Sequence, residues 1–401
     1  MTDFDFIENA KRCRACGCCT KFCPAGTDVK GFIKLFLEGK MTEAGELLFR
    51  NNPLSACTSR VCAHELQCEG HCTMLRLEGR PVTIGKLEHH VSSAFLDNFT
   101  IRPEAPTGKK IAVAGAGPSG LTVAAFMAMR GHDVTVYEKN PLMGGMMRYS
   151  IPSFVLPWEI IDKLVLCLQR HLGVKFRPNT LVGETVTFDE LKRDGFSALF
   201  IGTGTWKPRK LRIPGESLAN CHTALDYLHD PDAFDLGDRT VIIGAGNTGM
   251  DVARTALRKG VKEAIIFQRE GLDKVAARKP EVEITTSEGA VIQPWSTPLA
   301  IEPNGVRYTE KNPDTGETTE KFLPCSSVVV SISQGPHTLI GKDSGVEISE
   351  RDLIVTDECG RTSRPGVFAH GDTVTGSRTV VHASASSRRA AAAMDEYVRS
   401  L

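Results

Sequence analysis

The sequence predicts an α/β fold preceded by an all-α domain, and two observations lead to this prediction. One unit of strand, glycine-rich turn, helix and strand occurs near residue 110 and again near residue 240. Nine of the 13 cysteines lie between Cys13 and Cys72, in a region without a good strand pattern. With 401 residues, the chain is long enough for two or three domains of ordinary size.

Composition and charge argue against two classes of function. The 48 basic residues are balanced by 48 acidic ones, which argues against a mainly electrostatic nucleic-acid binder. The longest nearly uninterrupted apolar run, Leu121–Met129, is far shorter than the roughly 20 residues of a membrane span. The first residues lack the basic and apolar regions of a signal peptide. We therefore expect a cytoplasmic protein that binds neither nucleic acid nor a membrane.

Residues 1–105 are expected to be helical. Apolar residues from Val29 to Leu37 recur at i, i+3, i+4, i+7 and i+8, which places them on one face of a helix. Gly39 is suited to end that helix. The segment Arg102–Gly108 contains two prolines and is typical of a linker.

The first repeated unit predicts a Rossmann-like dinucleotide-binding domain. A strand over Ile111–Ala114 enters the turn, a helix ends near Gly131, and a second strand covers Val134–Tyr137. Three glycines in the turn allow a tight bend, close approach of the pyrophosphate, and close packing of helix on strand. Glu138 ends the second strand and can accept hydrogen bonds from ribose hydroxyls; a chance glycine-rich turn is the alternative. The turn residues are Gly115, Gly117, Pro118, Ser119 and Gly120.

The second unit repeats this pattern and predicts a second dinucleotide-binding domain. A strand over Thr240–Ile243 enters the turn, a helix extends to about Gly260, and the next strand covers Ala264–Phe267. The chain ends in α/β structure again, with a strand at Val367–Ala369 and an alanine-rich helix at Val380–Arg399. We expect the second domain to be inserted in the first. Its turn residues are Gly244, Gly246, Asn247, Thr248 and Gly249.

The residues after the second strand favour NADP(H) over NAD(H) at the second site. Gln268 occupies the position that corresponds to Glu138, and Arg269 follows it. An acidic residue there suits an unphosphorylated ribose, whereas a basic one accommodates a 2′-phosphate. Arg278 or Lys274 is expected to assist. The alternative is that Arg269 is an ordinary solvated surface residue.

The cysteines fall into two runs that indicate metal ligation, because cytoplasmic thiols stay reduced. The runs are Cys13-x2-Cys16-x-Cys18-Cys19-x3-Cys23-Pro and Cys57-x4-Cys62-x5-Cys68-x3-Cys72. A cysteine before proline is typical of ferredoxin-like cluster ligands, and nine cysteines suffice for two clusters. Structural zinc held by four thiolates is the alternative. The neighbouring redox-cofactor domains favour iron–sulfur clusters, since zinc carries no electrons.

Short motifs along essentially the whole chain resemble those of one family. They are Arg12-Cys13, Cys23-Pro24, Asn52-Pro-Leu54, Arg60-Val-Cys62, Cys68-Glu-Gly-His-Cys72, Val82-Thr-Ile-Gly85, Gly144-Gly145, Ile151-Pro152, Gly202-Thr-Gly204, Gly244–Gly249, Met250-Asp251 and Gly371-Asp372. In these motifs the chain resembles the small, NADPH-oxidising subunit of glutamate synthase. It is similar too to the amino-terminal half of dihydropyrimidine dehydrogenase and to the large subunit of the ferredoxin-linked NADPH transhydrogenase.

The resemblance implies two [4Fe–4S] clusters, one FAD and one NAD(P)H site. The fourth ligand of the second cluster is a Gln or Glu in relatives, and Glu88 stands at the matching distance; an ordinary surface glutamate is the alternative. Carried over by position, one cluster is expected at Cys13, Cys16, Cys19 and Cys72, and the other at Cys23, Cys62, Cys68 and Glu88.

The first cysteine run departs from the family pattern. The spacing between Cys16 and Cys19 is two residues shorter than in relatives, so Cys18 and Cys19 are exchangeable in the assignment. Cys57 lies one residue further from Cys62 than is usual. We interpret Cys18 and Cys57 as thiols that hold no cluster.

The resemblance also implies that the first glycine turn holds FAD and the second holds NAD(P)H. Asp372 is expected to bond the ribityl chain, and the helix from Val380 to direct its N-terminal amides at the flavin pyrimidine ring. His370 and His382 are unusual at their positions, and packed core residues are the ordinary interpretation. The other residues expected to contact FAD are Lys139, Gly144, Gly145, Gly204, Gly371 and Thr379.

The expected domains are a helical domain at 1–105 with two clusters, an FAD-binding domain at 106–228 and 337–401, and an NAD(P)H-binding domain at 229–336. The resemblance implies an electron-input subunit of a hetero-oligomer, which oxidises NAD(P)H and passes electrons through FAD and the clusters to a catalytic partner subunit or a ferredoxin. No Ser/His/Asp set or paired-carboxylate motif stands out, so no catalytic side chain is expected. The alternatives are a self-contained NAD(P)H:ferredoxin or electron-bifurcating transhydrogenase flavoprotein and a cofactor-binding scaffold without turnover.

Overall fold

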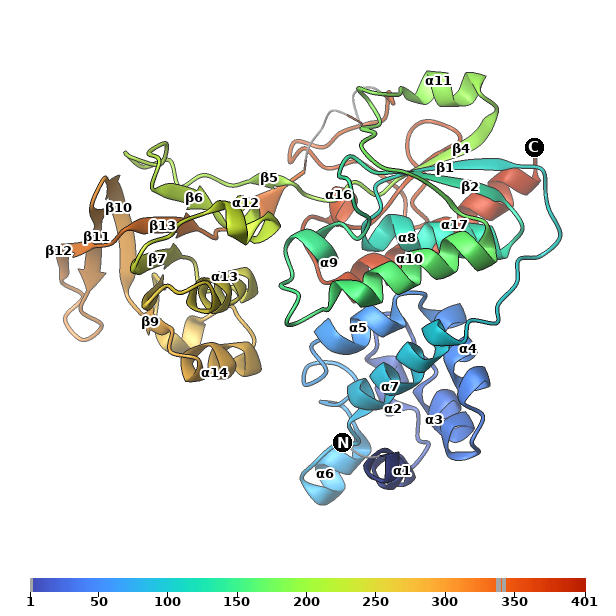
Figure 1. The fold of residues 1–401 in the computed structure, drawn as a ribbon, viewed down its shortest axis with the longest axis horizontal. Helices are drawn as coiled ribbons and strands as arrows, with labels where there is room; N and C mark the ends of the chain where they lie inside the picture. The colour runs from blue at the N-terminus through green and yellow to red at the C-terminus, as the bar shows by residue number, and fades with distance from the viewer. Residues whose placement is uncertain (1–2, 337–339, 341–343) are drawn as a thin grey trace. The chain divides into compact units, whose positions relative to one another are not determined.

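The computed structural model describes residues 3–336, 340 and 344–401, and the chain divides into two compact units. Unit 1 comprises Met1–Arg148, Ser153–Thr205 and Pro336–Leu401, and unit 2 comprises Tyr149–Pro152 and Trp206–Gly335. The predicted fold class is confirmed: an all-α region precedes two parallel sheets, and the second sheet is inserted in the first (Figure 1).

The N-terminal part of unit 1 consists of helices, and no strand occurs over residues 3–109. The predicted helix from Val29 is present with the expected bounds. Its buried residues Phe32 and Ile33 pack in one core with Leu48, Leu87 and Val91. The helices are α1 (Asp3–Lys11), α2 (Cys18–Lys21), α3 (Val29–Leu37), α4 (Met41–Asn51), α5 (Ser55–Val61), α6 (Thr73–Glu78) and α7 (Ile84–Asp97).

The first sheet has the strand order β15-β4-β1-β2-β3, and all its pairs are parallel. Parallel strands end at the same edge, so the segments that follow β1, β2, β4 and β15 meet there. The turn after β1, Glu138, Gly204 and Asp372 all belong to these segments. The strands are β1 (Lys110–Ala114), β2 (Asp133–Tyr137), β3 (Lys175–Arg177), β4 (Phe196–Ile201) and β15 (Val367–Ala369).

Helix α8 (Pro118–Met129) is the buried centre of this domain. All of its residues from Ser119 to Met129 are buried, because it packs on β1 and β2 and lies along α17 (Val380–Arg399) (Figure 1). An apolar surface on every side is expected of a helix enclosed in this way. The remaining helices of this part are α9 (Met146–Tyr149), α10 (Trp158–Leu172), α11 (Phe188–Arg193) and α16 (Asp372–Thr375).

Unit 2 contains the second parallel sheet, in the order β6-β13-β7-β8-β9. We expected residues up to 228 to belong with the first sheet, but β6 pairs with β13 and lies in unit 2. The expected return to the first sheet at residue 337 lies outside the described residues. The elements are β6 (Cys221–Thr223), α12 (Ala224–His229), η1 (Pro231–Ala233), β7 (Arg239–Ile243), α13 (Asn247–Arg258), β8 (Glu263–Phe267), η2 (Leu272–Lys274), α14 (Lys279–Ser287), β9 (Val291–Gln293) and β13 (Ser327–Val330).

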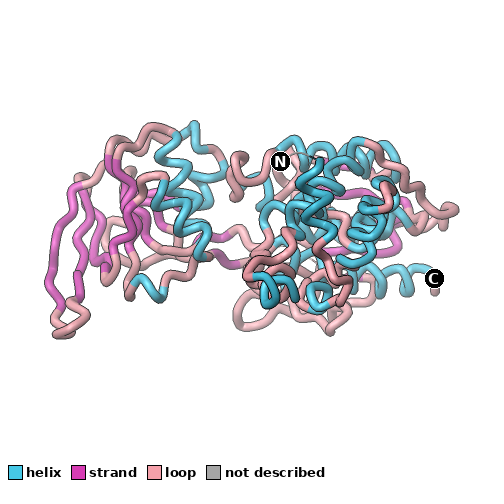
Figure 2. The backbone as a smooth tube through the Cα atoms, turned by 90° about the horizontal axis from the view of Figure 1, so that it is seen from below, coloured by secondary structure: helices cyan, strands magenta, loops and turns pink. Residues whose placement is uncertain are grey.

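Unit 2 also has an antiparallel sheet that the sequence analysis did not predict. Strands β10 (Ser296–Glu302), β11 (Gly305–Lys311) and β12 (Thr318–Pro324) form it, and Figure 2 shows them in magenta at the left. Val306 and Tyr308 of β11 are buried with Phe267 of the parallel sheet. Two short strands, β5 (Lys207–Pro208) and β14 (Gln334–Gly335), pair where the chain enters and leaves unit 2.

Within unit 1, a buried polar network connects the N-terminal helical region to the domain of the first parallel sheet. Asn52 is 2% exposed; its side chain donates to Thr58 Oγ1 at 2.9 Å and accepts from the Leu54 amide at 3.2 Å. Ser384 of α17 donates to Asn52 Oδ1 at 2.8 Å, and Thr122 Oγ1 of α8 lies 3.0 Å from Ser384 Oγ. Buried polar groups without partners cost free energy, so this network fixes the pairing of the two parts. None of the described helices is both long and apolar enough to cross a membrane.

We predict that Asn52→Ala lowers the free energy of unfolding by about 2 kcal/mol or more, because it leaves several buried groups without a partner. Urea unfolding of wild-type and variant protein measures the difference. Asn98→Ala, at an exposed asparagine that bonds only a helix carbonyl, serves as the control and is expected to change little. Equal stability of Asn52→Ala and wild type would contradict the assigned role.

Candidate functional site

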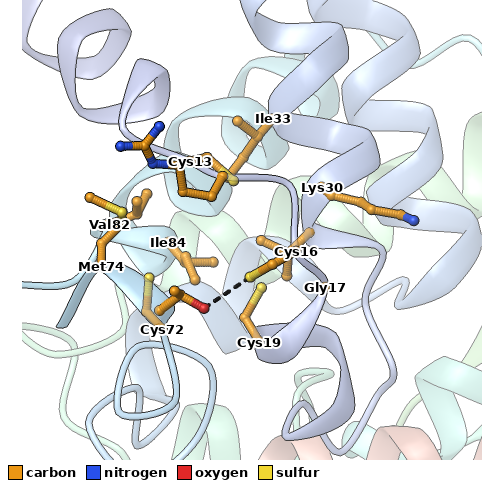
Figure 3. A pocket seen from close by; sticks show the side chains of 13 residues that line it. Cys13, Cys16, Gly17, Cys19, Lys30, Ile33, Cys72, Met74, Val82 and Ile84 are labelled. Atoms are coloured by element: carbon orange, nitrogen blue, oxygen red, sulfur yellow. Dashed lines mark hydrogen bonds between the residues drawn. The ribbon is translucent and has the colours of Figure 1, made fainter. Parts of the chain in front are cut away.

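The first predicted cysteine set surrounds one pocket of the helical region (Figure 3). Cys13 follows α1, Cys16 and Cys19 lie on either side of the start of α2, and Cys72 precedes α6. Burial raises the pKa of Cys13, and it raises that of Cys19 to about 11, so a positively charged group is needed to keep these thiols ionised. Most of the remaining lining is apolar and includes Val29, Ile33, Met74, Val82 and Ile84.

Four thiols around an apolar pocket fit a cubane cluster, in which each of four irons takes one thiolate. Among the described residues, no three His, Cys, Asp or Glu side chains are arranged to hold a single metal ion. The sulfur atoms of Cys13, Cys16, Cys19 and Cys72 lie instead around a shared space (Figure 3).

Cys16 is the one exposed thiol among the 13 cysteines, all of which are described. Its Sγ lies 3.0 Å from Thr73 Oγ1, and this hydrogen bond lowers the pKa of Cys16. The neighbouring Cys18 does not line the pocket, whereas Cys19 does. Cys57 is fully buried in α5, where burial raises its pKa to about 12.

The second predicted set comes from two loop positions, the segment between α5 and α6, which contains Cys68, and one helix. Cys23 follows α2, Cys62 follows α5, and Glu88 lies in α7, which packs against α5. Burial raises the pKa of Cys68, and the charges of Glu88, Glu69 and Cys23 raise it further. These groups therefore lie close enough to influence one another.

Glu88 is a buried carboxylate without a partner. It is 9% exposed, and within the described residues no donor or cation pairs with its side chain. Burial raises its pKa to about 8. An unpaired carboxylate in such a place is costly unless it ligates a metal or binds a proton. The surroundings of Glu88 thus fit a metal ligand and exclude the ordinary surface glutamate that was the alternative.

Glu69 positions the helix that carries Glu88, and the sequence analysis did not identify it. Its Oε1 accepts a hydrogen bond from the Gly85 amide at 2.9 Å, in the first turn of α7. A Cβ at Gly85 would lie 2.3 Å from His64 Nε2, so a larger residue there would have to displace the His64 ring. In the sequence, the position of Glu69 between Cys68 and Cys72 was the feature that could have pointed to a role in the site.

The first glycine turn has the geometry that its three glycines require. Gly115 adopts φ +98°, and a Cβ there would lie 2.6 Å from the Gly202 carbonyl oxygen. A Cβ at Gly120 would lie 1.8 Å from the Gly115 oxygen, so α8 could not pack on β1. The N-terminus of α8 follows this turn with Pro118 in its first turn, so the amides from Ser119 onward are available to an anion.

Glu138 bridges two segments at the edge of the sheet. Its Oε2 accepts from the Ala116 amide at 2.8 Å and its Oε1 from the Asn140 amide at 2.9 Å. Burial raises the pKa of Glu138 despite these bonds. Each oxygen retains capacity for a further hydrogen bond, which suits a ribose hydroxyl. Lys139 beside it is partly buried, and this burial lowers the pKa of Lys139.

Two segments that are distant in sequence converge on this turn. A Cβ at Gly145 would lie 2.6 Å from Gly117 Cα, and one at Gly371 would lie 1.9 Å from Ser119 Oγ. The close approach of these segments therefore forms a cradle there, to which Gly144 also belongs through the hydrogen bond from its amide to the Ala116 oxygen.

The segment after β15 completes the cradle. Asp372 accepts from the Arg378 amide at 3.1 Å, and burial raises its pKa to about 6. A hydrogen bond of 2.9 Å between Thr205 and Ser377 ties the loop after Gly204 to the same segment. Thr379 is the residue directly before α17, which begins at Val380 as expected.

The two unusual histidines have partners in the fold. His370 is 6% exposed, and its Nδ1 accepts from the Gly371 amide at 3.0 Å. Burial lowers the pKa of His370 to about 4, which favours a neutral ring. His382 Nδ1 lies 2.7 Å from Thr379 Oγ1 at the start of α17.

The second glycine turn repeats this geometry in unit 2. Gly244 adopts φ +115°, and a Cβ at Gly249 would lie 2.1 Å from the Gly244 oxygen. Asn247 Oδ1 accepts from the Arg278 amide at 3.0 Å, which brings Arg278 beside the turn. The Arg278 guanidinium lies 2.5 Å from Glu281. Gly246 and Thr248 are partly exposed within the same turn.

Arg269 follows β8, the strand next to the turn-bearing β7. It is exposed, and no hydrogen bond or ion pair engages its side chain within the described residues. Gln268 beside it is buried. A cation therefore stands unpaired at the edge where the ribose of a dinucleotide is expected.

Asp251 is a further feature that the sequence analysis did not count as part of the site. It lies in the first turns of α13, and burial raises its pKa to about 8, with Glu281 adding to the effect. The positive charges of Arg254 and Arg278 lower the pKa of Asp251. The signal available in the sequence was the motif Met250-Asp251.

Comparisons with known proteins agree with this arrangement. The family described as pyridine nucleotide-disulphide oxidoreductase matches residues 102–387, and the one described as dihydropyrimidine dehydrogenase domain II, 4Fe-4S cluster, matches residues 1–99. The Escherichia coli (strain K12) glutamate synthase [NADPH] small chain is 32% identical, over 95% of this chain and 89% of that protein.

Two further proteins are similar. The NAD-dependent dihydropyrimidine dehydrogenase subunit PreT of Salmonella typhimurium (strain LT2) is 31% identical, over 98% of this chain and 94% of PreT. The structure of Mycobacterium tuberculosis FprA in complex with NADPH aligns with a TM-score of 0.61 and 18% identity, covering 74% of this chain and 85% of FprA. The chain therefore belongs to the pyridine nucleotide-disulphide oxidoreductase family, in the group that joins an FAD- and NAD(P)-binding domain to a 4Fe–4S domain and includes the glutamate synthase small chains and PreT.

Proposed function

We propose that this chain is the electron-input subunit of a heteromeric oxidoreductase, which oxidises NADPH and delivers its electrons to a partner protein through FAD and two [4Fe–4S] clusters. The observation that supports this most directly is that one compact unit contains both the flavin cradle and the two cysteine sets. When bound, FAD would accept a hydride and the clusters would transfer electrons one at a time.

The residues of the first turn bind and orient the flavin nucleotide in this proposal. The amides at the start of α8 face its pyrophosphate, and Glu138 accepts from its ribose. Asp372 accepts from its sugar chain, and the amides at the start of α17 stabilise negative charge on its ring. The residues assigned to FAD are Gly115, Gly117, Pro118, Ser119, Gly120, Glu138, Lys139, Gly144, Gly145, Gly204, Gly371, Asp372, Thr379 and Val380.

The residues of unit 2 bind the nicotinamide dinucleotide. The amides of Gly246–Gly249 face the pyrophosphate, and Arg269 pairs with the 2′-phosphate. The named relatives support either nicotinamide, since one is an NADPH protein and the other an NAD-dependent one. The unpaired Arg269 is the reason for choosing NADPH here. Arg278 is the second basic residue of the site.

In this proposal the two cysteine sets hold the clusters. That the chain works with a partner subunit is inferred from the two relatives. Both relatives are named as a chain or subunit of a larger enzyme, which supports a hetero-oligomer. The proposed ligands are Cys13, Cys16, Cys19 and Cys72 for one cluster and Cys23, Cys62, Cys68 and Glu88 for the other.

We predict that Arg269→Ala raises the KM for NADPH about tenfold or more, since a hydrogen bond to a charged group contributes about 1.5–3 kcal/mol. The KM for NADH should stay near the wild-type value. Steady-state reduction of ferricyanide by either nicotinamide measures both constants, and wild-type turnover in this assay tests the proposed activity itself. Lys262→Ala, an exposed lysine at the other end of β8, is the control. Equal effects on both nicotinamides would show that Arg269 does not bind the 2′-phosphate.

We predict that Glu88→Ala lowers the iron content or changes the electron paramagnetic resonance signal of one cluster only. Glu88→Cys should restore the iron content, because a thiolate replaces the carboxylate, and should shift that same signal. Glu43→Ala, at an exposed residue of α4, serves as the control. A spectrum of Glu88→Ala identical to wild type would remove Glu88 from the ligands.

A further inference from the structure

The surface around Cys16 carries an unusual excess of positive charge. Residues 11–34 contain six basic side chains and one acidic one, a formal charge of +5, whereas the whole chain has none. The acidic Asp28 is engaged, because its Oδ1 accepts from the Gly31 amide at 3.1 Å. Nearby Glu78 pairs with Arg12 at 2.9 Å.

Two of these cations lie at the pocket that Cys16 lines. Arg14 and Lys30 line the same pocket as Cys16 and are exposed, as Cys16 is. Two more are exposed on adjoining elements: Lys21 ends α2, and Arg76 lies in α6, the helix that begins at Thr73. Within the described residues, none of these four cations has a salt-bridge partner. We call Arg14, Lys21, Lys30 and Arg76 the basic face.

Exposed apolar side chains lie on the same elements. Phe22, next to Lys21, is 49% exposed and stacks on His71 with ring centroids 3.5 Å apart. Leu77, next to Arg76, is 64% exposed. Exposed apolar side chains beside charged ones offer area that a protein partner can bury. Together with the zero net charge of the chain, they favour a protein over a nucleic acid as the occupant.

We propose that the basic face is the docking surface for an electron-accepting protein whose own docking surface is acidic. This inference rests on the proposed function. A cluster held by Cys13, Cys16, Cys19 and Cys72 reaches solvent most closely at Cys16, because the other three thiols are partly or fully buried. Complementary charge around that point accelerates encounter and orients the partner.

Two haem proteins of opposite surface charge test this inference: cytochrome b5, which is acidic around its haem, and cytochrome c, which is basic. We expect the holoprotein to bind cytochrome b5 at low ionic strength and to lose affinity as salt is added. In Arg14→Glu/Lys30→Glu, the Kd for cytochrome b5 from calorimetry, and the KM for its reduction by NADPH, should rise about tenfold or more. Reduction of cytochrome c should become faster.

A second variant tests whether the loss of binding comes from the basic face and not from a disturbed cluster. A control variant tests whether a change of net charge alone has the same effect. Lys21→Glu/Arg76→Glu leaves the pocket lining intact and should weaken cytochrome b5 binding in the same direction, with unchanged iron content. Arg170→Glu/Lys192→Glu changes two exposed cations outside the helical region by the same charge and should leave the Kd unchanged.

Unchanged affinity for cytochrome b5 in both face variants would overturn the inference. An equal loss in the control would overturn it too, because net charge would then suffice. The Kd requires no turnover, so a wild-type protein that binds cytochrome b5 but reduces no acceptor with either nicotinamide would contradict the proposed function alone.

Discussion

The buried contacts of α17 hold together the two parts of unit 1. On one side α17 packs along α8, whose start forms the first glycine turn. On the other side, Ser384 donates to Asn52, and Arg388 donates to the carbonyl oxygens of Ala25 at 3.3 Å and Asn51 at 2.9 Å. Ala25 follows Cys23 by two residues, so the helix that completes the flavin cradle also fixes a loop of the second cysteine set.

The order of the cysteine sets within unit 1 follows from the same packing. Helix α5, which Cys62 follows, contacts α17 and α10 of the FAD-binding part. Helices α2 and α6, which adjoin the first set, lie further from that part (Figure 1). Cys62 of the second set therefore follows a helix that contacts the FAD-binding part, whereas the first set, with the exposed Cys16, adjoins the basic face.

Local patterns in the sequence predict most of the elements that position the site. The strands before both glycine turns are short apolar runs, and α3 and α17 have the predicted bounds. The sheet β10–β12 escaped prediction in part because its last strand is polar: β12 is exposed over nearly its whole length and shows no alternation. The pairing of such a strand depends on its contacts with the neighbouring strands, which a pattern of apolar residues within the strand does not reveal.

Within the candidate site, the residues that depend on long-range contacts could not be predicted. Asn52 and Ser384 lie 332 residues apart, and no local pattern links them. Glu69 acts on α7 through a backbone amide and has no pattern of its own. Whether Cys18 or Cys19 lines the pocket depends on which face of the short helix α2 is buried. The sequence of two adjacent cysteines does not determine that face.

The central claim is that electrons from NADPH reach the clusters by way of the flavin. Anaerobic mixing of the holoprotein with NADPH, followed by stopped-flow absorbance and freeze-quenched paramagnetic resonance, tests it most directly. We expect the flavin band to bleach before the cluster signals appear, and the clusters of FAD-depleted protein to stay oxidised. Clusters that are reduced equally fast without FAD, or that stay oxidised while the flavin of the holoprotein is fully reduced, would contradict the claim.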